Sequence, residues 1–357
     1  MMKRLGDYIR PVDVRNRDLK VTRLLGVSIT KEFMPSIANI VGTDLSAYKV
    51  VTKGQFAYGP VTSRTGDKIS VALLDGYDDA IISQAYTVFE VVDTNALDPE
   101  YLMMWFRRPE FDRYARFHSH GSAREVFDWE EMCEVQIPVP AIEKQREIVA
   151  EYNTLATRIE TNKKLIATLE QTAQTLYRHT FVDNIDPNNL PQGWRMGTVG
   201  ELFELQRGFD LPTQNRQKGD YPIYASTGIA EYHSEYKVKA PGIVTGRSGS
   251  IGEVFYVDEN YWPLNTTLWV KEFKKATPFY AYYCLKNVNL ESLSQGSAVP
   301  TLNRNDVHAQ DFLIPDNKTL DLFEHQQKAI FKHKKNLAQE NQTLTQMQTL
   351  LLSKMGA

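Results

Sequence analysis

Apolar side chains alternate at spacings of four and three through the middle of the chain, from about residue 141 to residue 180. This repeat of 3.5 residues is typical of a helix that supercoils around a partner. Charged and amide side chains fill the remaining positions, prolines precede the stretch, and a run of helix breakers at 183–191 follows it. The pattern predicts one long amphipathic helix, whose seam consists of Ile148, Tyr152, Leu155, Ile159, Asn162, Ile166, Leu169, Ala173 and Leu176.

The same pattern returns near the C-terminus, displaced by 175 positions, as from Ile148 to Phe323. The displacement also relates Gly121-Ser122-Ala123 to Gly296-Ser297-Ala298 and Val139-Pro140 to Ile314-Pro315. We interpret the chain as a tandem duplication. Polar residues occupy half of the second seam, where they either set the register of a helix pair or face a partner. That seam consists of Phe323, Gln327, Ile330, Lys334, Leu337, Asn341, Leu344, Gln348 and Leu351.

Each half of the duplication predicts a globular domain followed by a long helix. Short β-type runs separated by Gly, Pro and Asp alternate with short helical segments such as 99–106, 199–205 and 278–285. The predicted fold is therefore α/β (mixed α+β), with a first domain at 1–140, a helix at 141–181, a linker at 182–191, a second domain at 192–315 and a helix at 316–357. We expect the helices to form an antiparallel coiled coil between the domains, which gives the repeat a pseudo-twofold axis.

Composition narrows the functional classes. The 357 residues are 42% hydrophobic, enough for two cores, but no apolar stretch reaches the roughly 18 residues of a membrane span. The first residues lack the apolar region of a secretory signal, and only Cys133 and Cys284 occur, so we expect a cytoplasmic protein without disulfide bonds. The net charge of −3 argues against a general polycation, so any nucleic-acid contact requires either locally concentrated basic residues or a partner that supplies the remaining positive charge.

Glycine-rich turns supply the best candidates for such contacts. Residues 246–252, Gly-Arg-Ser-Gly-Ser-Ile-Gly, lack the Lys-Ser/Thr ending of a P-loop and are interpreted as a hairpin turn. Arg247 there, and Arg64 in a related turn of the first half, each precede a Ser/Thr-Gly pair. A guanidinium on a rigid turn suits bidentate contact to guanine or phosphate, although a structural ion pair explains it equally well. Neighbouring candidates for DNA contact are Arg15, Arg17, Tyr58, Arg207, Tyr224 and Thr245.

Two other classes of protein are open at this point. Asp258 with Glu272 and Lys274 loosely matches the acidic pair and lysine of Mg²⁺-dependent nucleases, which would make the chain an enzyme. Alternatively, the chain is a coiled-coil scaffold that never touches DNA. No His or Cys spacing predicts a metal site.

Several short motifs resemble the specificity subunit of type I restriction–modification systems. Ile137-Pro-Val-Pro140 with Glu143-Lys-Gln-Arg146 is similar to that family's junction between strand and helix. The other similar segments are Leu176–Asp183 at the end of the first helix, Leu190–Arg195 at the start of the second domain, and Leu350–Met355. The second junction, Ile314-Pro-Asp316, lacks the Glu-x-Gln-Arg motif.

The resemblance implies a non-catalytic DNA-recognition subunit. Each domain would read one half of a split, asymmetric site in double-stranded DNA, and the helices would act as a spacer that docks two adenine methyltransferase subunits. Restriction subunits would join them, and SAM, ATP and Mg²⁺ would belong to these partners, with no cofactor and no membrane contact in this chain. A related type II system that cuts near its site is an alternative.

Overall fold

The computed structural model describes residues 2–37, 42–62, 66, 68–121, 124–183, 185–296 and 300–356. The chain divides into two compact units, which we call unit 1 (Met1–Asn162 with Gln339–Ala357) and unit 2 (Lys163–Ala338). Each unit therefore contains one globular domain and a segment of each long helix. The predicted linker and domain boundaries remain predictions.

Unit 1 is a mixed α and β unit. Its strands are β1 (Met2–Arg4), β2 (Ile9–Val12), β3 (Leu25–Val27), β4 (Phe33–Pro35), β5 (Lys49–Thr52), β6 (Phe56–Tyr58), β7 (Val71–Leu73), β8 (Asp79–Ile82), β9 (Thr87–Val91) and β10 (Gln136–Pro138). Its short helices are η1 (Leu5–Asp7), η2 (Leu45–Ala47), α1 (Pro99–Phe106), α2 (Pro109–Phe117) and α3 (Trp129–Glu134). The long helix α4 (Ile142–Phe181) begins in this unit.

Unit 2 repeats this plan. Its strands are β11 (Arg195–Thr198), β12 (Phe203–Arg207), β13 (Tyr221–Ala225), β14 (Gly228–His233), β15 (Gly242–Gly246), β16 (Val254–Val257), β17 (Trp262–Pro263), β18 (Thr267–Phe273), β19 (Ser294–Gln295), β20 (Thr301–Leu302) and β21 (Asp311–Ile314). Its helices are α5 (Val199–Leu202), η3 (Thr213–Asn215), α6 (Pro278–Asn287), α7 (Arg304–His308) and the second long helix α8 (Asn317–Lys354), which ends in unit 1. The helix predicted at 199–205 is shorter because β12 begins at Phe203.

The main sheets of the two units have the same topology. In unit 1 the order is β2-β9-β6-β7, and in unit 2 it is β12-β18-β15-β16, with every neighbouring pair antiparallel. The strand before each long helix, β10 or β21, pairs with the first strand of its own unit, β1 or β11. The tandem duplication inferred from the helix pattern therefore extends through both globular domains.

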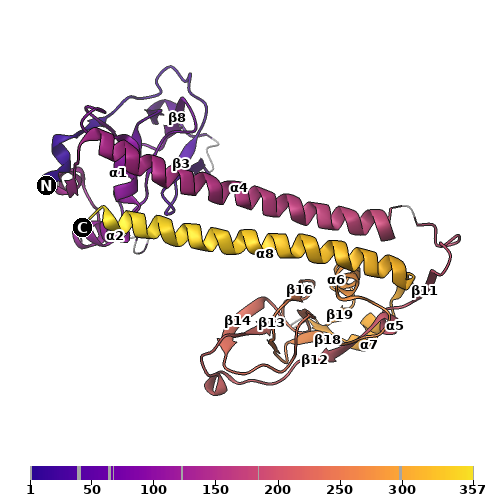
Figure 1. Ribbon diagram of the computed structural model, residues 1–357. Coiled ribbons are helices and arrows are strands. Elements are labelled where there is room, and N and C mark those ends of the chain that lie inside the picture. The colour runs from indigo at the N-terminus through magenta and orange to yellow at the C-terminus, as the bar shows by residue number, and fades with distance from the viewer. Residues whose placement is uncertain are drawn as a thin grey trace. The chain divides into compact units, whose positions relative to one another are not determined.

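Segments of α4 and α8 pack antiparallel within each unit (Figure 1). In unit 1, Ile148 and Tyr152 pack on the same core as Leu351, and Asn162 Nδ2 donates a hydrogen bond to Asn341 Oδ1 at 3.0 Å. In unit 2, Gln327 Nε2 donates to the Ala173 carbonyl at 3.1 Å, and Lys334 forms an ion pair with Glu170. These polar residues of the second seam therefore bind the opposite helix, which favours a role in register.

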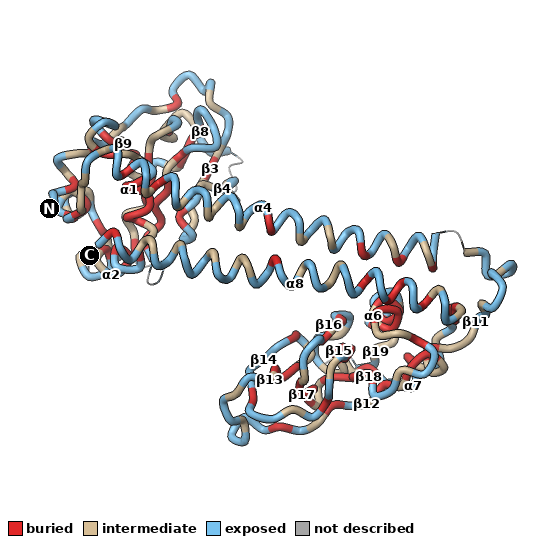
Figure 2. Tube along the Cα trace, in the orientation of Figure 1, coloured by how far each residue is buried: buried red, intermediate tan, exposed pale blue. Residues whose placement is uncertain are grey.

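Burial follows the predicted helical period. Every seam residue of α4 and α8 is buried or half-buried, and the positions between are mostly exposed, as the colouring of Figure 2 shows. Ala173 and Leu337 are among the seam residues that solvent barely reaches. The 3.5-residue pattern thus predicted the contact faces of both helices correctly. Despite their length, neither α4 nor α8, nor any shorter helix of the described residues, is apolar enough for a membrane crossing.

The two long helices begin in different ways. Gln145 on α4 is completely buried, accepts a hydrogen bond from Asp98 N, and donates to the Ala96 and Pro140 carbonyls, each at 2.9 Å. The Gln145 side chain thereby links α4 to the start of α1. In unit 2 the corresponding position, 175 residues later, is the buried Leu320, and Glu324 one turn further accepts a hydrogen bond from Phe279 N on α6. The missing Glu-x-Gln-Arg motif at this junction therefore reflects a different set of contacts.

Asp316 caps the start of α8. Its carboxylate accepts hydrogen bonds from Thr319 Oγ1 at 2.7 Å, Thr319 N at 3.1 Å and Trp194 Nε1 at 2.6 Å. Hydrogen bonds to Thr319 and Trp194 lower the pKa of Asp316 to about 2, because they stabilise the ionised carboxylate. The Gly-Trp sequence at the start of the second domain is thereby fastened to the second long helix.

Candidate nucleic-acid interface

The glycine-rich stretch of unit 2 is a hairpin turn, as predicted. It joins β15 to β16, and Gly249 and Gly252 have φ of +86° and +108°. A Cβ at Gly246 would lie 1.9 Å from the Ser250 carbonyl oxygen, so only glycine fits immediately before Arg247. The two ends of the turn therefore lie in close backbone contact at Gly246 and Ser250.

Three backbone hydrogen bonds fix the base of Arg247. Arg247 N and Ser248 N donate to the Thr266 carbonyl at 2.8 and 3.2 Å, and the Arg247 carbonyl accepts from Leu302 N at 2.8 Å. The guanidinium is therefore carried by a backbone held from two sides. The side chain itself is half-buried.

The same hydrogen bonds identify the equivalent position in unit 1. There, the Pro60 carbonyl accepts from Phe127 N at 2.8 Å, just as the Arg247 carbonyl accepts from Leu302 N. Arg247 therefore matches Pro60, the second residue of the β6–β7 connection, and the related turn predicted at Arg64 falls within that same connection. Arg64 and Thr65 lie outside the described residues, as do Ser122, Ala123, Ser297 and Ala298 of the repeated turns.

Arg207 is the last residue of β12, which pairs with β18 on the side opposite to β15. Its Nη2 forms an ion pair with Asp210 Oδ1 at 3.1 Å. The next residue is Gly208, where a Cβ would lie 2.2 Å from the Leu264 carbonyl oxygen and 2.5 Å from that of Pro263. Like Arg247, Arg207 therefore stands beside a glycine that packs against backbone.

The structure brings Arg207 and Arg247 together in one open groove of about 830 Å³. Arg304, the first residue of α7, lines it as well, and no described residue binds its guanidinium. Sequence reasoning missed Arg304, although it directly follows the helix-capping Asn303, whose side chain accepts from Asn305 N. The other lining residues include Gln206, Asp210, Gln295, Thr301 and Asn303. Three guanidinium groups around one carboxylate make this groove locally basic.

Three predicted contact residues are instead core residues. Tyr58 and Thr245 occupy equivalent places, each on the strand that pairs with β9 or β18, and neither is exposed. Thr245 Oγ1 donates to the Glu253 carbonyl at 2.7 Å, and burial raises the pKa of the Tyr58 hydroxyl. Their side chains point into the sheet packing, so the prediction that they contact DNA is wrong.

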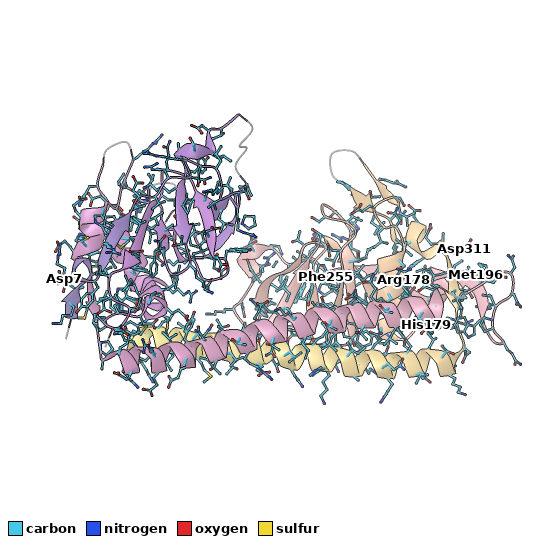
Figure 3. All side chains as sticks on the ribbon, turned by 90° about the horizontal axis from the view of Figure 1, so that it is seen from above. Asp7, Arg178, His179, Met196, Phe255 and Asp311 are labelled. Atoms are coloured by element: carbon cyan, nitrogen blue, oxygen red, sulfur yellow. The ribbon has the colours of Figure 1, made fainter. Side chains whose placement is uncertain are left out.

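Tyr224 on β13 is also buried. Its ring packs against Tyr261 and against Phe255 of β16, which Figure 3 labels. Burial raises the pKa of Tyr224 to about 12. This side chain stabilises the smaller sheet of unit 2 and offers no surface to a ligand.

Two basic candidates of unit 1, Arg15 and Arg17, share no binding partner among the described residues. Arg15 Nη1 donates to the Ala47 carbonyl at 2.8 Å and Nη2 pairs with Asp13 at 2.9 Å, which holds Arg15 against the loop. Arg17 is exposed, and no described residue binds its guanidinium. The β2–β9 ladder ends with Val12 opposite Val88, and continuing that register by one residue aligns Asp13 with Arg207, which stands opposite Leu268 in unit 2. Only unit 2 therefore gathers predicted arginines around a single groove of the described structure.

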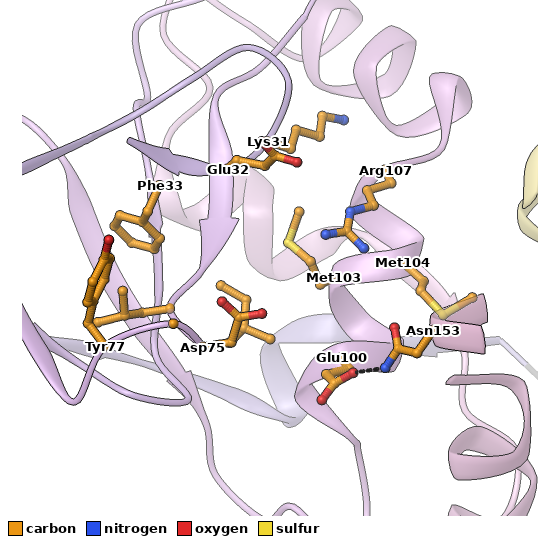
Figure 4. Close-up of a pocket in the computed structure, with 13 residues that line it drawn as sticks. Lys31, Glu32, Phe33, Asp75, Tyr77, Glu100, Met103, Met104, Arg107 and Asn153 are labelled. Carbon is orange, nitrogen blue, oxygen red and sulfur yellow. Dashed lines mark hydrogen bonds between the residues drawn. The ribbon is translucent and has the colours of Figure 1, made fainter. Parts of the chain in front are cut away.

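Unit 1 has a different cavity, of about 400 Å³, beside the β3–β4 hairpin and α1 (Figure 4). Both acidic and basic side chains line it, including Asp75, Glu100 and Arg107, and Asn153 Nδ2 donates to Glu100 Oε2 at 2.5 Å. Lys31 at its edge is buried and pairs with Asp112 at 2.8 Å. With its charges of both signs, this cavity lacks the basic character of the unit 2 groove.

The nuclease constellation is not assembled. Asp258 forms an ion pair with Lys335 of α8, and Lys274 Nζ donates to the Gly200 carbonyl at 2.9 Å. Asp258 follows β16, which is separated from the β18 strand of Glu272 by β15. Within the described part of the chain, no group of three or more His, Cys, Asp or Glu side chains could hold a metal ion. Cys133 and Cys284 are both free thiols.

Comparison with known proteins gives one family. The family model described as "Type I restriction modification DNA specificity domain" matches twice, at residues 42–171 and 191–351. The "Type I restriction enzyme MjaIX specificity subunit" of Methanocaldococcus jannaschii is 22% identical over 302 residues, which cover 74% of this chain and 70% of that protein. The "Type I restriction enzyme HindI specificity subunit" of Haemophilus influenzae is 26% identical over 153 residues, covering 42% of this chain and 32% of that protein.

Two solved structures have a similar fold. A type I restriction–modification S subunit from M. genitalium matches with a TM-score of 0.66 and 17% identity, over 99% of this chain and 95% of that one. A chain from a structural study of assembly and conformational transition of the type I system matches with a TM-score of 0.54 and 17% identity, over 99% and 97%. The similarity spans both units.

Proposed function

Since this chain belongs to the family of type I restriction–modification DNA specificity subunits, we propose that unit 1 and unit 2 each read one part of a split, asymmetric DNA target. The observation that carries the proposal is the repeated framework with unlike residues at equivalent places. Arg207 and Arg247 of unit 2 correspond to Asp13 and Pro60 of unit 1. Two domains that share a backbone but differ in the side chains of their turns would recognise different base sequences. We call the sequence read by unit 1 the first word and the sequence read by unit 2 the second word.

In unit 2 the groove of Arg207, Arg247 and Arg304 is the proposed contact surface. Arginine binds guanine O6 and N7 through two parallel hydrogen bonds, and it also binds phosphate. The rigid backbone beneath Arg247 reduces the entropy lost when the guanidinium binds. In unit 1, Arg17 remains the exposed candidate among the described residues.

We propose that α4 and α8 form the spacer and the docking surface for two adenine methyltransferase subunits. Large apolar side chains remain exposed on the outer faces of these helices, at Leu165, Leu322, Met347 and Leu350, with exposed fractions of 42%, 60%, 49% and 57%. Of these, Met347 and Leu350 are neighbours on one face of α8, and an exposed apolar pair of this kind supports association with a partner. Restriction subunits would bind the resulting complex, and SAM, ATP and Mg²⁺ would act in these partners rather than in this chain.

The net charge of −3 supports a model in which this chain and its partners both contribute to DNA binding. Phosphate neutralisation supplies most of the affinity of DNA-binding proteins, and this chain concentrates few basic groups. We therefore propose that the chain alone binds DNA weakly and that its methyltransferase partners supply additional phosphate contacts.

A domain exchange tests the proposed function. Residues 192–315 are replaced by the corresponding domain of a relative, and the methylated motifs of cells that carry the complex are sequenced. We expect the second word to change and the first to persist. A motif in which both words change together, or in which neither does, would contradict the two-reader proposal. Incubation of the purified chain with DNA and Mg²⁺ tests the nuclease alternative, which requires cleavage without partners.

A further inference from the structure

A chain of polar contacts links the two predicted arginines of the unit 2 groove. Arg207 Nη2 donates to Asp210 Oδ1 at 3.1 Å and lies 3.4 Å from Oδ2. Asn265 Nδ2 donates to the same Asp210 Oδ1, and Arg247 Nη1 makes a long contact of 3.5 Å with the backbone carbonyl oxygen of Asn265. One carboxylate and one asparagine thus connect guanidinium groups from β12 and from the β15–β16 turn.

We propose that Asp210 and Asn265 are positioning residues that determine base specificity in the second word. This inference rests on the proposed function of unit 2 as a DNA reader. A guanidinium has five N–H donors, and these contacts use Nη2 of Arg207 and Nη1 of Arg247. Nε and Nη2 of Arg247 remain available for two parallel hydrogen bonds to a base, and Arg207 keeps one such pair, Nη1 with Nη2, because Nη2 carries a second N–H. Holding one side of each fork selects the orientation in which the other side meets the base edge.

The backbone around these residues is held independently of the network. Phe209 N donates to the Pro263 carbonyl at 2.8 Å, Gly208 N donates to the Thr267 carbonyl at 3.1 Å, and Arg247 N donates to the Thr266 carbonyl at 2.8 Å. The side chains of Arg207 and Asp210 are 49% and 62% exposed, so their ion pair contributes little to stability. Removing the Asp210 carboxylate should therefore free Arg207 directly, and should loosen the Asn265 side chain beside Arg247, without unfolding unit 2.

A polar pair elsewhere in unit 2 provides a matched control. Arg178 Nη2, in the last turn of α4, and Asp183 Oδ1, just after the helix, form an ion pair at 2.9 Å, with side chains 60% and 42% exposed (Arg178 is labelled in Figure 3). Like Asp210, Asp183 neutralises an exposed arginine. It lies outside the residues that line the groove.

The test uses the full-length chain in complex with its methyltransferase subunits. Genomic methylation is measured for the natural chain and for Asp210→Ala, Asn265→Ala and Asp183→Ala, at sites that carry one substitution in either word. We expect Asp210→Ala to lower the discrimination at one or more positions of the second word by roughly 5- to 10-fold, within the range that one bidentate contact supplies. Asn265→Ala should act in the same direction. The first word and the Asp183→Ala motif should be unchanged.

A double variant separates positioning from a general structural role. Because Asp210 is proposed to act through Arg207 and Arg247, Asp210→Ala should add no further loss of discrimination when both arginines are already alanine. Additive loss in that background, an unchanged second word in Asp210→Ala, or equal loss in both words would each overturn the inference. Failure of the natural complex to methylate any two-part motif would instead overturn the proposed function.

Discussion

Unit 1 and unit 2 share a backbone framework but carry different side chains at equivalent positions of it. The first-unit positions that match Arg207, Arg247 and Arg304 are Asp13, Pro60 and Trp129. Beneath them the framework is preserved, because a buried residue followed by a glycine stands at the end of both strands: Tyr58 ends β6 and precedes Gly59, and Thr245 precedes Gly246, the last residue of β15. The comparison shows that ladder and turn hydrogen bonds maintain the fold while the exposed tips are free to diverge.

The largest expected effect concerns the helix junctions, where Gln145 of α4 corresponds to Leu320 of α8. Gln145→Leu would place the residue found in unit 2 at this position of unit 1, and would leave the partly buried Asp98 N and two carbonyl groups without their hydrogen-bond partner. We expect unit 1 to lose roughly 3 kcal/mol or more of its free energy of unfolding. Chemical denaturation, with hydrogen exchange at α1 as the local probe, measures this loss.

The reverse exchange, Leu320→Gln, is the matched variant for that prediction. It would bury an amide where the described structure offers a hydrophobic core, and should destabilise unit 2 by a few kcal/mol. Neutral behaviour of both variants would show that the two junctions are interchangeable, against the contacts described above.

The next effect distinguishes the two glycines that precede the tips. An alanine Cβ at Gly246 would meet the Ser250 backbone oxygen at 1.9 Å, whereas at the equivalent Gly59 it would meet the Ser70 hydroxyl at 2.7 Å. A side-chain hydroxyl can rotate away and a backbone carbonyl cannot. We expect Gly246→Ala to cost roughly 2–3 kcal/mol and Gly59→Ala less than about 1 kcal/mol. Thermal unfolding of the two variants gives the comparison, and equal losses would contradict it.

The sequence predicted the parts of the molecule that depend on local periodicity. Both seams were correct because a 3.5-residue repeat defines one face of a helix wherever the partner lies. Tyr58, Tyr224 and Thr245 were assigned to DNA contact wrongly, since alternation along a strand does not say which face is the core. The turns of Arg64 and Arg247 do fall in equivalent connections, but the connection is longer in unit 1, at residues 59–70, than in unit 2, at 247–253, and the residue that matches Arg247 by its backbone bond is Pro60.

Arg304 and Asp210 could not be found in this way. They join the groove through the β12-β18-β15 ladder and the short helix α7, which bring together segments far apart in the sequence. No local pattern records that proximity. The basic groove therefore depends on the sheet topology, and local sequence patterns identified only two of its three arginines.

A smaller effect is expected at the tips themselves. Arg247→Ala should relax base preference at one position of the second word, at a cost of about 1–3 kcal/mol in discrimination, if the guanidinium contacts a base. Pro60→Ala, at the equivalent place in unit 1, should leave the first word unchanged, because its role there is carried by the backbone carbonyl. Methylation sequencing of both variants measures the two words in one experiment. Uniformly weaker methylation with an unchanged motif would assign Arg247 to phosphate instead.

The smallest effect is a pH dependence confined to one unit. His308 of unit 2 accepts a hydrogen bond from Leu205 N at Nε2, 2.8 Å away, and the matching residue of unit 1 is Cys133. Burial, with the nearby charges of Lys274 and Arg304, lowers the pKa of His308 below its usual value near 6.5, whereas burial raises the pKa of Cys133. His308 therefore becomes charged as the pH falls through its lowered pKa, whereas Cys133 stays neutral over the same range.

Because the folded state favours neutral His308, its contribution to stability is complete above about pH 6.5 and declines as the pH falls through the lowered pKa. Protonation would also remove the acceptor for Leu205 N. We expect the protection of the Leu205 amide against hydrogen exchange, corrected for the intrinsic rate, to fall between pH 7.5 and pH 5. In His308→Gln this pH dependence should disappear, because glutamine does not titrate. Protection that falls equally in the variant would place the acid-sensitive group elsewhere in unit 2.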